Sequence, residues 1–188
     1  IISYVNPLFE TYDTIIFTKA LENIIKAYDF DILLLGSTLM GRDLGPRLSA
    51  RVHTGLTADA TLLEFEQQDD RLSLLATRPA LGGNLFATII CPDNKPQMAT
   101  IRPGVFSIEA FESQKAKVIS FDEAITVKSN VKIISKKVSE TAHVDLTKAK
   151  LIIAGGRGVA TMFPILKEIA LLTGGEVAAS RAVVDQNI

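Results

Sequence analysis

A strand, a glycine turn, a helix and a second strand follow one another near the end of the chain, and this order constrains the fold most. Residues 151–154 are a short apolar run, the glycine-rich segment 155–158 follows, and a helical pattern comes next. The glycine pair 174–175 ends that helix before a second apolar run at 176–179. Two strands joined by a helix lie parallel in one sheet, so the sequence predicts an α/β fold.

The same alternation predicts an earlier α/β layer. Apolar residues at helical spacing indicate a helix over 18–28, and the run 32–35 indicates a buried strand. We expect Asp43 to cap a second helix that ends at Gly55. The residues on its inward face are expected to be Leu44, Leu48 and Val52.

Short apolar segments separated by Asp, Gly, Pro and Asn come next, and they are typical of successive strands. These segments are residues 61–66, 72–78, 84–90 and 98–102. From 112 to 150 the chain is rich in Lys, Ser and Glu, with one further strand expected at 131–134. We therefore predict a parallel-sheet α/β N-terminal domain with additional strands over 1–118, an inter-domain connection over 119–146, and an incomplete α/β unit over 147–188.

Composition argues against several classes of protein. The 188 residues are 47% hydrophobic and 22% charged, which is typical of folded domains rather than disordered chains. A net charge of -1 gives no basic surplus, so we expect no nucleic-acid partner. The apolar runs fall short of the ~18–20 residues that a membrane-spanning helix needs, so no membrane insertion is expected. The single cysteine, Cys91, is interpreted as a core thiol in a reducing compartment.

The glycine turn of the last unit is where we expect an anionic group to bind. Gly155, Gly156, Arg157 and Gly158 lie between a strand and a helix, where backbone amides and the positive end of the helix favour negative charge. Arg157 adds a fixed cation. The spacing matches neither the dinucleotide fingerprint nor the mononucleotide loop, so a tight turn with an incidental arginine is the alternative.

A second polar pair, Ser180 and Arg181, follows the strand at 176–179. Parallel strands share one carboxyl edge, so Arg157 and Arg181 could converge there on one anionic ligand, and a nucleotide cofactor would fit. In the alternative interpretation, Arg181 is a solvated loop residue or caps the end of a neighbouring helix.

Other polar residues favour structural roles. His53 and His143 have no metal-ligating neighbours at ligand spacing, so we predict no metal site and expect both at the surface. Ser37 lacks the flanking pattern of a hydrolase nucleophile. Two further groups are interpreted as salt-bridged or loop-anchoring residues, with docking of a partner or a ligand as the alternative. They are Arg42, Asp43 and Arg47, and the pair Arg78 and Arg102, each of which precedes a proline.

Several blocks, in chain order, resemble the alpha subunits of electron transfer flavoproteins. These blocks are residues 36–45, 54–61, 77–84, 96–106, 155–159 and 178–185. The resemblance implies a heterodimer with a beta subunit, FAD held noncovalently, and electrons passed singly from flavin dehydrogenases to an acceptor. It implies an electron carrier rather than a catalyst of a bond-changing reaction, or a part of a bifurcating complex, in the bacterial cytoplasm or the mitochondrial matrix of a eukaryote.

The resemblance also assigns residues. It implies that 147–188 begin a Rossmann-like FAD-binding domain, in which Arg157 and Ser180 match FAD-binding positions. Arg181 matches the arginine beside the flavin ring, where a fixed cation favours the anionic reduced forms. Family members carry further βα units before the position of Ile1, and further glycine, threonine, serine and histidine motifs after that of Asp185. We therefore expect the FAD site of this chain to be incomplete.

Two rival functions use the same residues. A regulatory or assembly module that binds AMP or ATP at the glycine turn, without redox activity, is the principal alternative, and flavin absorbance would separate it from a flavoprotein. A nicotinamide dehydrogenase domain is disfavoured because the dinucleotide fingerprint is absent.

Overall fold

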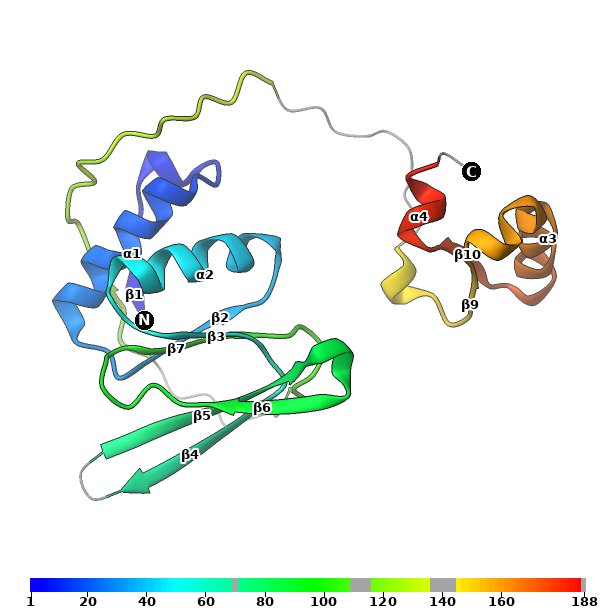
Figure 1. The fold of residues 1–188 in the computed structure, drawn as a ribbon. Coiled ribbons are helices and arrows are strands. Elements are labelled where there is room, and N and C mark those ends of the chain that lie inside the picture. The colour runs from blue at the N-terminus through cyan, green and yellow to red at the C-terminus, as the bar shows by residue number, and fades with distance from the viewer. Residues whose placement is uncertain (69–70, 109–115, 136–144, 187–188) are drawn as a thin grey trace. The chain divides into compact units, whose positions relative to one another are not determined.

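The computed structural model describes residues 1–68, 71–108, 116–135 and 145–186, and the chain divides into two compact units (Figure 1). Unit 1 is Ile1–Lys132 and unit 2 is Ile133–Ile188. Both units contain parallel strands joined through helices, which confirms the predicted α/β class. The finer domain limits at 118/119 and 146/147 stay a prediction. No helix in the described ranges is long and apolar enough to cross a membrane.

Unit 1 has a central parallel sheet between a layer of helices and a second sheet (Figure 1). The central sheet has the order β2 (Ile32–Gly36), β7 (Gln97–Ile101), β3 (Leu56–Ala60). The helices are α1 (Thr14–Tyr28) and α2 (Leu39–Arg51). The second sheet is antiparallel, with the order β4 (Leu62–Gln68), β5 (Arg71–Ala80), β6 (Leu85–Ile89). The strands expected at 61–66, 72–78, 84–90 and 98–102 are thereby confirmed.

Short elements complete unit 1. A two-stranded parallel pair joins the first residues to the chain beyond the second sheet. The pair is β1 (Ile2–Ser3) with β8 (Ile119–Ser120), and the 3-10 turns are η1 (Pro7–Phe9) and η2 (Leu81–Gly83).

The apolar core of unit 1 lies between its two sheets. The core residues are Ala60, Leu74, Ala76 and Ala99, packed against Ile32, Leu63 and Ile101. The buried side-chain amide of Gln97 also connects the layers. Its Oε1 accepts from the backbone N of Leu74 at 2.8 Å, and its Nε2 donates to the backbone O of Leu72 at 2.8 Å. A strand of the parallel sheet is thus tied to the middle strand of the antiparallel sheet.

Both helices of unit 1 begin earlier than the apolar pattern predicts. Helix α1 begins at Thr14 because the carboxylate of Asp13 accepts from the backbone N of Ile15 and Ile16. Helix α2 begins at Leu39 because Thr38 caps it through the backbone N of Gly41. The expected cap at Asp43 is therefore wrong.

Gly41 fixes how α2 leaves the sheet. A Cβ at this position would lie 1.8 Å from the backbone O of Gly36, so only glycine allows the helix to pass over the end of β2. The helix ends at Arg51 rather than at Gly55, with Leu44 and Leu48 buried as expected.

Three further expectations have clear outcomes. The strand expected at 131–134 is wrong, since those residues pair with no described strand and Ile134 is 94% exposed. His53 is at the surface as predicted, whereas His143 lies outside the described residues. Cys91 is half-buried rather than in the core, with its Sγ 3.6 Å from the Thr54 hydroxyl.

Unit 2 has the predicted order of strand, turn, helix and strand. Its elements are η3 (Leu146–Lys148), β9 (Ile152–Gly155), η4 (Arg157–Met162), α3 (Phe163–Thr173), β10 (Glu176–Ala179) and α4 (Arg181–Val184). Gly174, at a φ of 65°, ends α3 as expected. The buried residues of α3 are Phe163 and Ala170. Of the other apolar residues in and before this helix, Met162, Ile165 and Ile169 are exposed and Leu166 is half-buried.

Helix α1 buries a carboxylate. The Glu22 side chain is 5% exposed and pairs with three cations, which are Lys26 at 2.6 Å, Arg51 of α2 at 3.1 Å and Lys19 at 3.3 Å. The hydrogen bond from Lys26 and those from Arg51 and Lys19 outweigh burial, and they lower the pKa of Glu22 to about 2. This cluster joins α1 to α2.

We expect unit 1 to lose stability in acid through Glu22. Because the folded pKa of Glu22 lies below its ordinary value of 4.5, its contribution is present above about pH 4.5 and is lost as the pH falls towards 2. Glu22→Gln should remove roughly 2–3 kcal/mol of unfolding free energy at pH 7 and flatten the pH dependence below 4.5. Urea unfolding at pH 7 and pH 3 measures both effects. The exposed Glu64→Gln is the matched control, and equal losses in the two variants would contradict the prediction.

Candidate functional site

The predicted site lies at the carboxyl edge of the two-stranded sheet in unit 2. Strands β9 and β10 are parallel, and their last residues, Gly155 and Ala179, are paired. One residue further, the backbone N of Ser180 donates to the backbone O of Gly155 at 3.0 Å. The structure therefore brings the glycine turn and the Ser180–Arg181 pair to the same edge.

The three glycines of the turn have different surroundings. A Cβ on Gly155 would meet Leu166, Phe163 and Val159 side chains at 2.8–3.1 Å, so close packing of α3 and η4 on β9 accounts for this glycine. A Cβ on Gly156 would lie 3.9 Å from the hydroxyl of Ser180. Nothing lies within 4 Å of a Cβ on Gly158, which is exposed. A ligand can approach the backbone at Gly156 and Gly158.

The helix expected directly after the glycines begins later. The 3-10 turn η4 intervenes, and α3 starts only at Phe163, with Pro164 in its first turn. The positive end of α3 is thus displaced from the glycines. The first amides of η4, which have no partner inside the turn, take its place as the groups that favour an anion.

Polar side chains at this edge are largely unpaired. Within the described ranges, neither the Arg157 guanidinium nor the Ser180 hydroxyl has a hydrogen-bond or ion-pair partner. Arg181 forms an ion pair with Asp185 at 3.5 Å, and its side chain is 94% exposed. Turn η4 and helix α4 lie next to each other, so Arg157 and Arg181 are on neighbouring elements.

This arrangement fits the phosphate end of a nucleotide cofactor. It combines open backbone at Gly156 and Gly158, a cation at Arg157 and a hydroxyl donor at Ser180. Arg181 supplies a second cation, which forms an ion pair with the Asp185 carboxylate. The six residues remain a predicted cofactor-binding set, with Gly155 in a supporting position.

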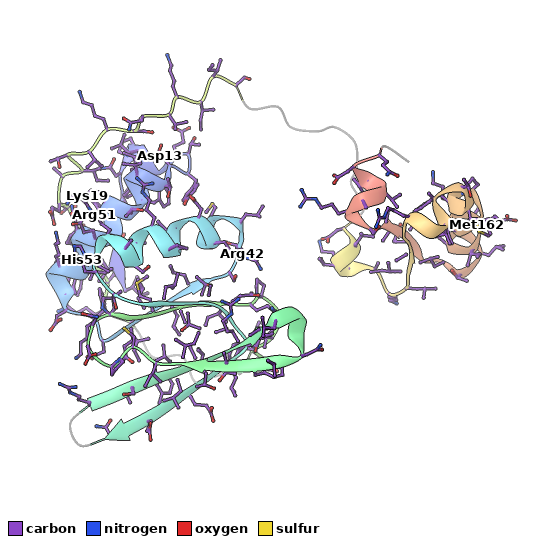
Figure 2. The ribbon with its side chains drawn as sticks, in the orientation of Figure 1. Asp13, Lys19, Arg42, Arg51, His53 and Met162 are labelled. Carbon is purple, nitrogen blue, oxygen red and sulfur yellow. The ribbon has the colours of Figure 1, made fainter. Side chains whose placement is uncertain are left out.

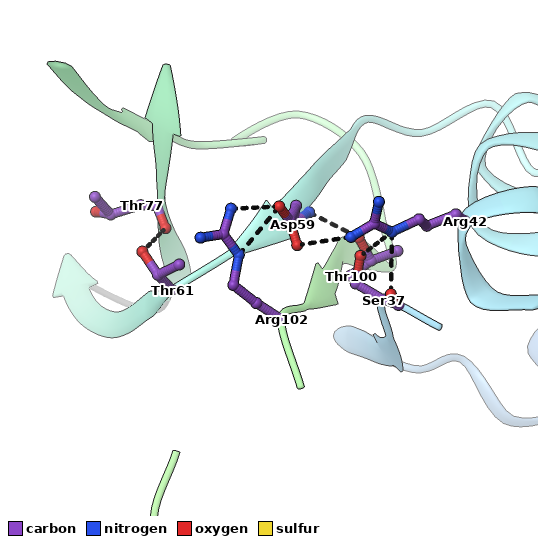
Figure 3. A network of polar contacts seen from close by, with 7 residues as sticks. All are labelled: Ser37, Arg42, Asp59, Thr61, Thr77, Thr100 and Arg102. Carbon is purple, nitrogen blue, oxygen red and sulfur yellow. Dashed lines mark hydrogen bonds and ion pairs between the residues drawn. The ribbon is translucent and has the colours of Figure 1, made fainter. Parts of the chain in front are cut away.

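The corresponding carboxyl edge of unit 1 is filled by its own side chains (Figure 3). Asp59, at a φ of 64°, accepts from Arg102 at 2.6 and 3.2 Å and lies 3.5 Å from Arg42. The Arg102 hydrogen bonds lower the pKa of Asp59 despite partial burial. Arg42 also donates to the backbone O and hydroxyl of buried Ser37, at 3.0 and 3.1 Å.

These contacts decide between the two interpretations of the N-terminal arginines. Arg42 and Arg102 are anchored structurally, and their shared partner, Asp59, was not found from the sequence because its unusual backbone carries no sequence pattern. Asp43 pairs with neither Arg42 nor Arg47 but accepts from the Tyr12 hydroxyl at 2.6 Å. Arg78 lies in β5 with its Nε buried and without a partner in the described part of the chain. The described residues contain no cluster of three metal-ligating side chains.

Substitution of Gly155 and of Gly158 should distinguish a glycine required for packing from one whose surroundings are open. Gly155→Ala forces a Cβ into Leu166 and Phe163, so it should lower the unfolding free energy of unit 2 by about 1–3 kcal/mol. In Gly158→Ala the new Cβ points into open space, so this substitution should change the unfolding free energy by less than about 0.5 kcal/mol. Thermal and urea unfolding measure the difference. Equal stability of the two variants would show that α3 does not pack against Gly155 as described.

Comparisons with known proteins agree with the division of the chain into unit 1 and unit 2. Residues 1–126 match the electron transfer flavoprotein domain, and residues 145–188 match the electron transfer flavoprotein FAD-binding domain. The protein FixB of Clostridium saccharobutylicum is 44% identical over 184 residues, which cover 96% of this chain and 54% of that protein.

Two other relatives have related names. The electron transfer flavoprotein subunit alpha of Thermoanaerobacterium thermosaccharolyticum is 44% identical, over 96% of this chain and 55% of that protein. The acryloyl-CoA reductase electron transfer subunit beta of Anaerotignum propionicum is 34% identical, over 96% of this chain and 57% of that protein. The chain thus spans about half the length of the curated relatives that it matches, and it belongs to the alpha-subunit family of electron transfer flavoproteins.

Proposed function

We propose that this chain is part of the alpha subunit of a heterodimeric electron transfer flavoprotein, and that unit 2 contributes to binding FAD. The observation that carries the proposal is the carboxyl edge of β9 and β10, where open glycine backbone lies next to Arg157, a cation without an ion-pair partner among the described residues. The match of residues 145–188 to the FAD-binding domain supports FAD as the nucleotide. In the proposed role, the protein takes electrons singly from flavin dehydrogenases and passes them to an acceptor.

The residues at this carboxyl edge have different proposed roles in binding FAD. Gly156, Gly158 and the amides of η4 would hold phosphate oxygens, with Arg157 balancing their charge and Ser180 donating a hydrogen bond. Arg181 would lie beside the flavin ring, where its charge favours the reduced ring over the oxidised one. FAD supplies the reversible uptake and release of electrons. The protein supplies position and charge.

We further propose that polypeptide outside unit 2 completes the FAD site. In unit 2 only β9 and β10 form the described sheet, and Ile165, Ile169 and Leu172 of α3 remain exposed at 41–78%. Such apolar residues are normally covered by packed neighbours. Further residues of the alpha subunit and its beta-subunit partner would supply that cover. The proposed location of the complex is the bacterial cytoplasm.

Flavin content tests the proposal against the AMP or ATP module. The protein purified with its beta-subunit partner should be yellow and hold FAD in stoichiometric amount, measured by absorbance after release. The 188-residue chain alone should bind FAD much more weakly, by fluorescence quenching, because its site is incomplete. A colourless complex that binds AMP or ATP and cannot be reconstituted with FAD would overturn the electron-carrier function.

Substitution of Arg181 tests the electrostatic role. In the complex with the beta subunit, Arg181→Ala should lower the first reduction potential of FAD by tens of millivolts, since ~59 mV corresponds to a tenfold change for one electron. Arg181→Lys keeps the cation but loses the planar guanidinium, so it should lower the potential less. Spectroelectrochemical titration measures both. Unchanged potentials in both variants, with FAD bound, would make Arg181 structural.

A further inference from the structure

We propose that unit 1 has a separate site for the phosphate group of a small organic phosphate, in the groove between α1 and α2. This groove is formed by residues of unit 1 alone and involves none of the residues at the edge of β9 and β10. The proposal therefore stands independently of the flavin function.

The groove consists of two adjoining hollows that share lining residues of α1 and α2. Their volumes are about 340 and 500 Å³, and both are lined by Glu22, Ala50 and Arg51. Each is within the range of sites for small molecules. Lys19, Arg51 and His53, which line these hollows, are labelled in Figure 2. The cations that line the two hollows are Lys19, Lys26, Arg47, Arg51 and Lys95.

Positive charge is concentrated at one point of the groove. Three cations lie within 3.3 Å of the Glu22 carboxylate, which neutralises one of them and leaves a local excess of two charges. The whole chain has a net charge of -1, so this excess is a local feature. Glu22 is buried and joins both helices, and it therefore holds the cations in fixed positions before a ligand arrives.

Unused hydrogen-bonding groups surround this point. Arg51 uses its Nε for Glu22, and among the described residues its two terminal nitrogens have no partner. Arg47 forms no hydrogen bond or ion pair with any described residue, although its charge acts on Asp13. The hydroxyl of Thr18, which lines the first hollow, is buried and unpaired within the described ranges. Guanidinium nitrogens that remain available are suited to phosphate oxygens.

The compactness of the cluster favours a phosphate over an acidic protein segment. Carboxylates on one face of an extended chain are ~7 Å apart, because each residue advances the chain by ~3.3 Å. A phosphate monoester instead places up to two negative charges on one group, which matches the local excess of two. Apolar side chains in the hollows would contact the organic part, and they are Ile15, Ile25, Val52 and Val127.

Calorimetric titration of the protein, purified with its beta-subunit partner, tests this site. Phenyl phosphate and pyrophosphate are the probes, and phenol is the matched compound without phosphate. Both phosphates should bind, whereas phenol should not. Arg51→Gln should weaken phenyl phosphate binding by at least about tenfold, because it removes charge-assisted hydrogen bonds. Arg47→Gln should weaken it severalfold without disturbing the Glu22 cluster, and Lys167→Gln of α3 is the charge-matched control.

A chemical footprint localises the binding. Phenyl phosphate should slow acetylation of Lys26, measured by mass spectrometry, and leave that of Lys167 unchanged. FAD content should stay constant in all variants, which separates failure here from failure of the flavin function. The proposal is overturned if neither phosphate binds, if Arg47→Gln and Lys167→Gln bind phenyl phosphate equally, or if only a poly-glutamate peptide protects Lys26.

Discussion

The shared carboxyl edge of parallel strands is the constraint on which the arrangement of this protein depends. Each βα junction places its loop at that edge, so polar residues far apart in sequence meet there. In unit 1, Asp59 accepts hydrogen bonds from Arg102 and forms an ion pair with Arg42, so the edge is occupied by the protein's own ion pairs (Figure 3). In unit 2, Arg157 and Ser180 have no such partner in the described part of the chain. The difference in side-chain pairing, more than the fold, distinguishes the structural edge of unit 1 from the predicted cofactor edge of unit 2.

Much of the fold could be predicted from the sequence because its signals are local. Apolar runs bounded by Gly, Pro and Asp gave the strands of unit 1 and the order of unit 2. The starts of helices were harder to predict. Asp43 and Thr38 are both common capping residues, so the sequence alone does not choose between them. The close contact between Gly41 and the backbone of Gly36 shows that α2 begins at the earlier position, after Thr38.

Errors of the sequence-based predictions occurred where a neighbouring element decides the outcome. Residues 131–134 have strand propensity but no described strand beside them, and propensity without a partner does not make a sheet. The face that α3 buries follows from its contact with β9 at Gly155, which the helical period alone could not orient. The buried Glu22 was not predicted, because three cations on two helices compensate for its burial and the periodicity of α1 does not reveal them.

The amide of Gln97 has a consequence for how unit 1 folds. Strands β4, β5 and β6 are consecutive, so their sheet involves contacts close in sequence, whereas β7 must return past them to reach its place between β2 and β3. Contacts close in sequence form sooner because they close shorter loops. The two hydrogen bonds between the Gln97 side-chain amide and the backbone of Leu72 and Leu74 can form only after both sheets exist in their final register. We therefore expect these contacts to form after the antiparallel sheet, once β7 has taken its place, and to couple the two sheets in unfolding.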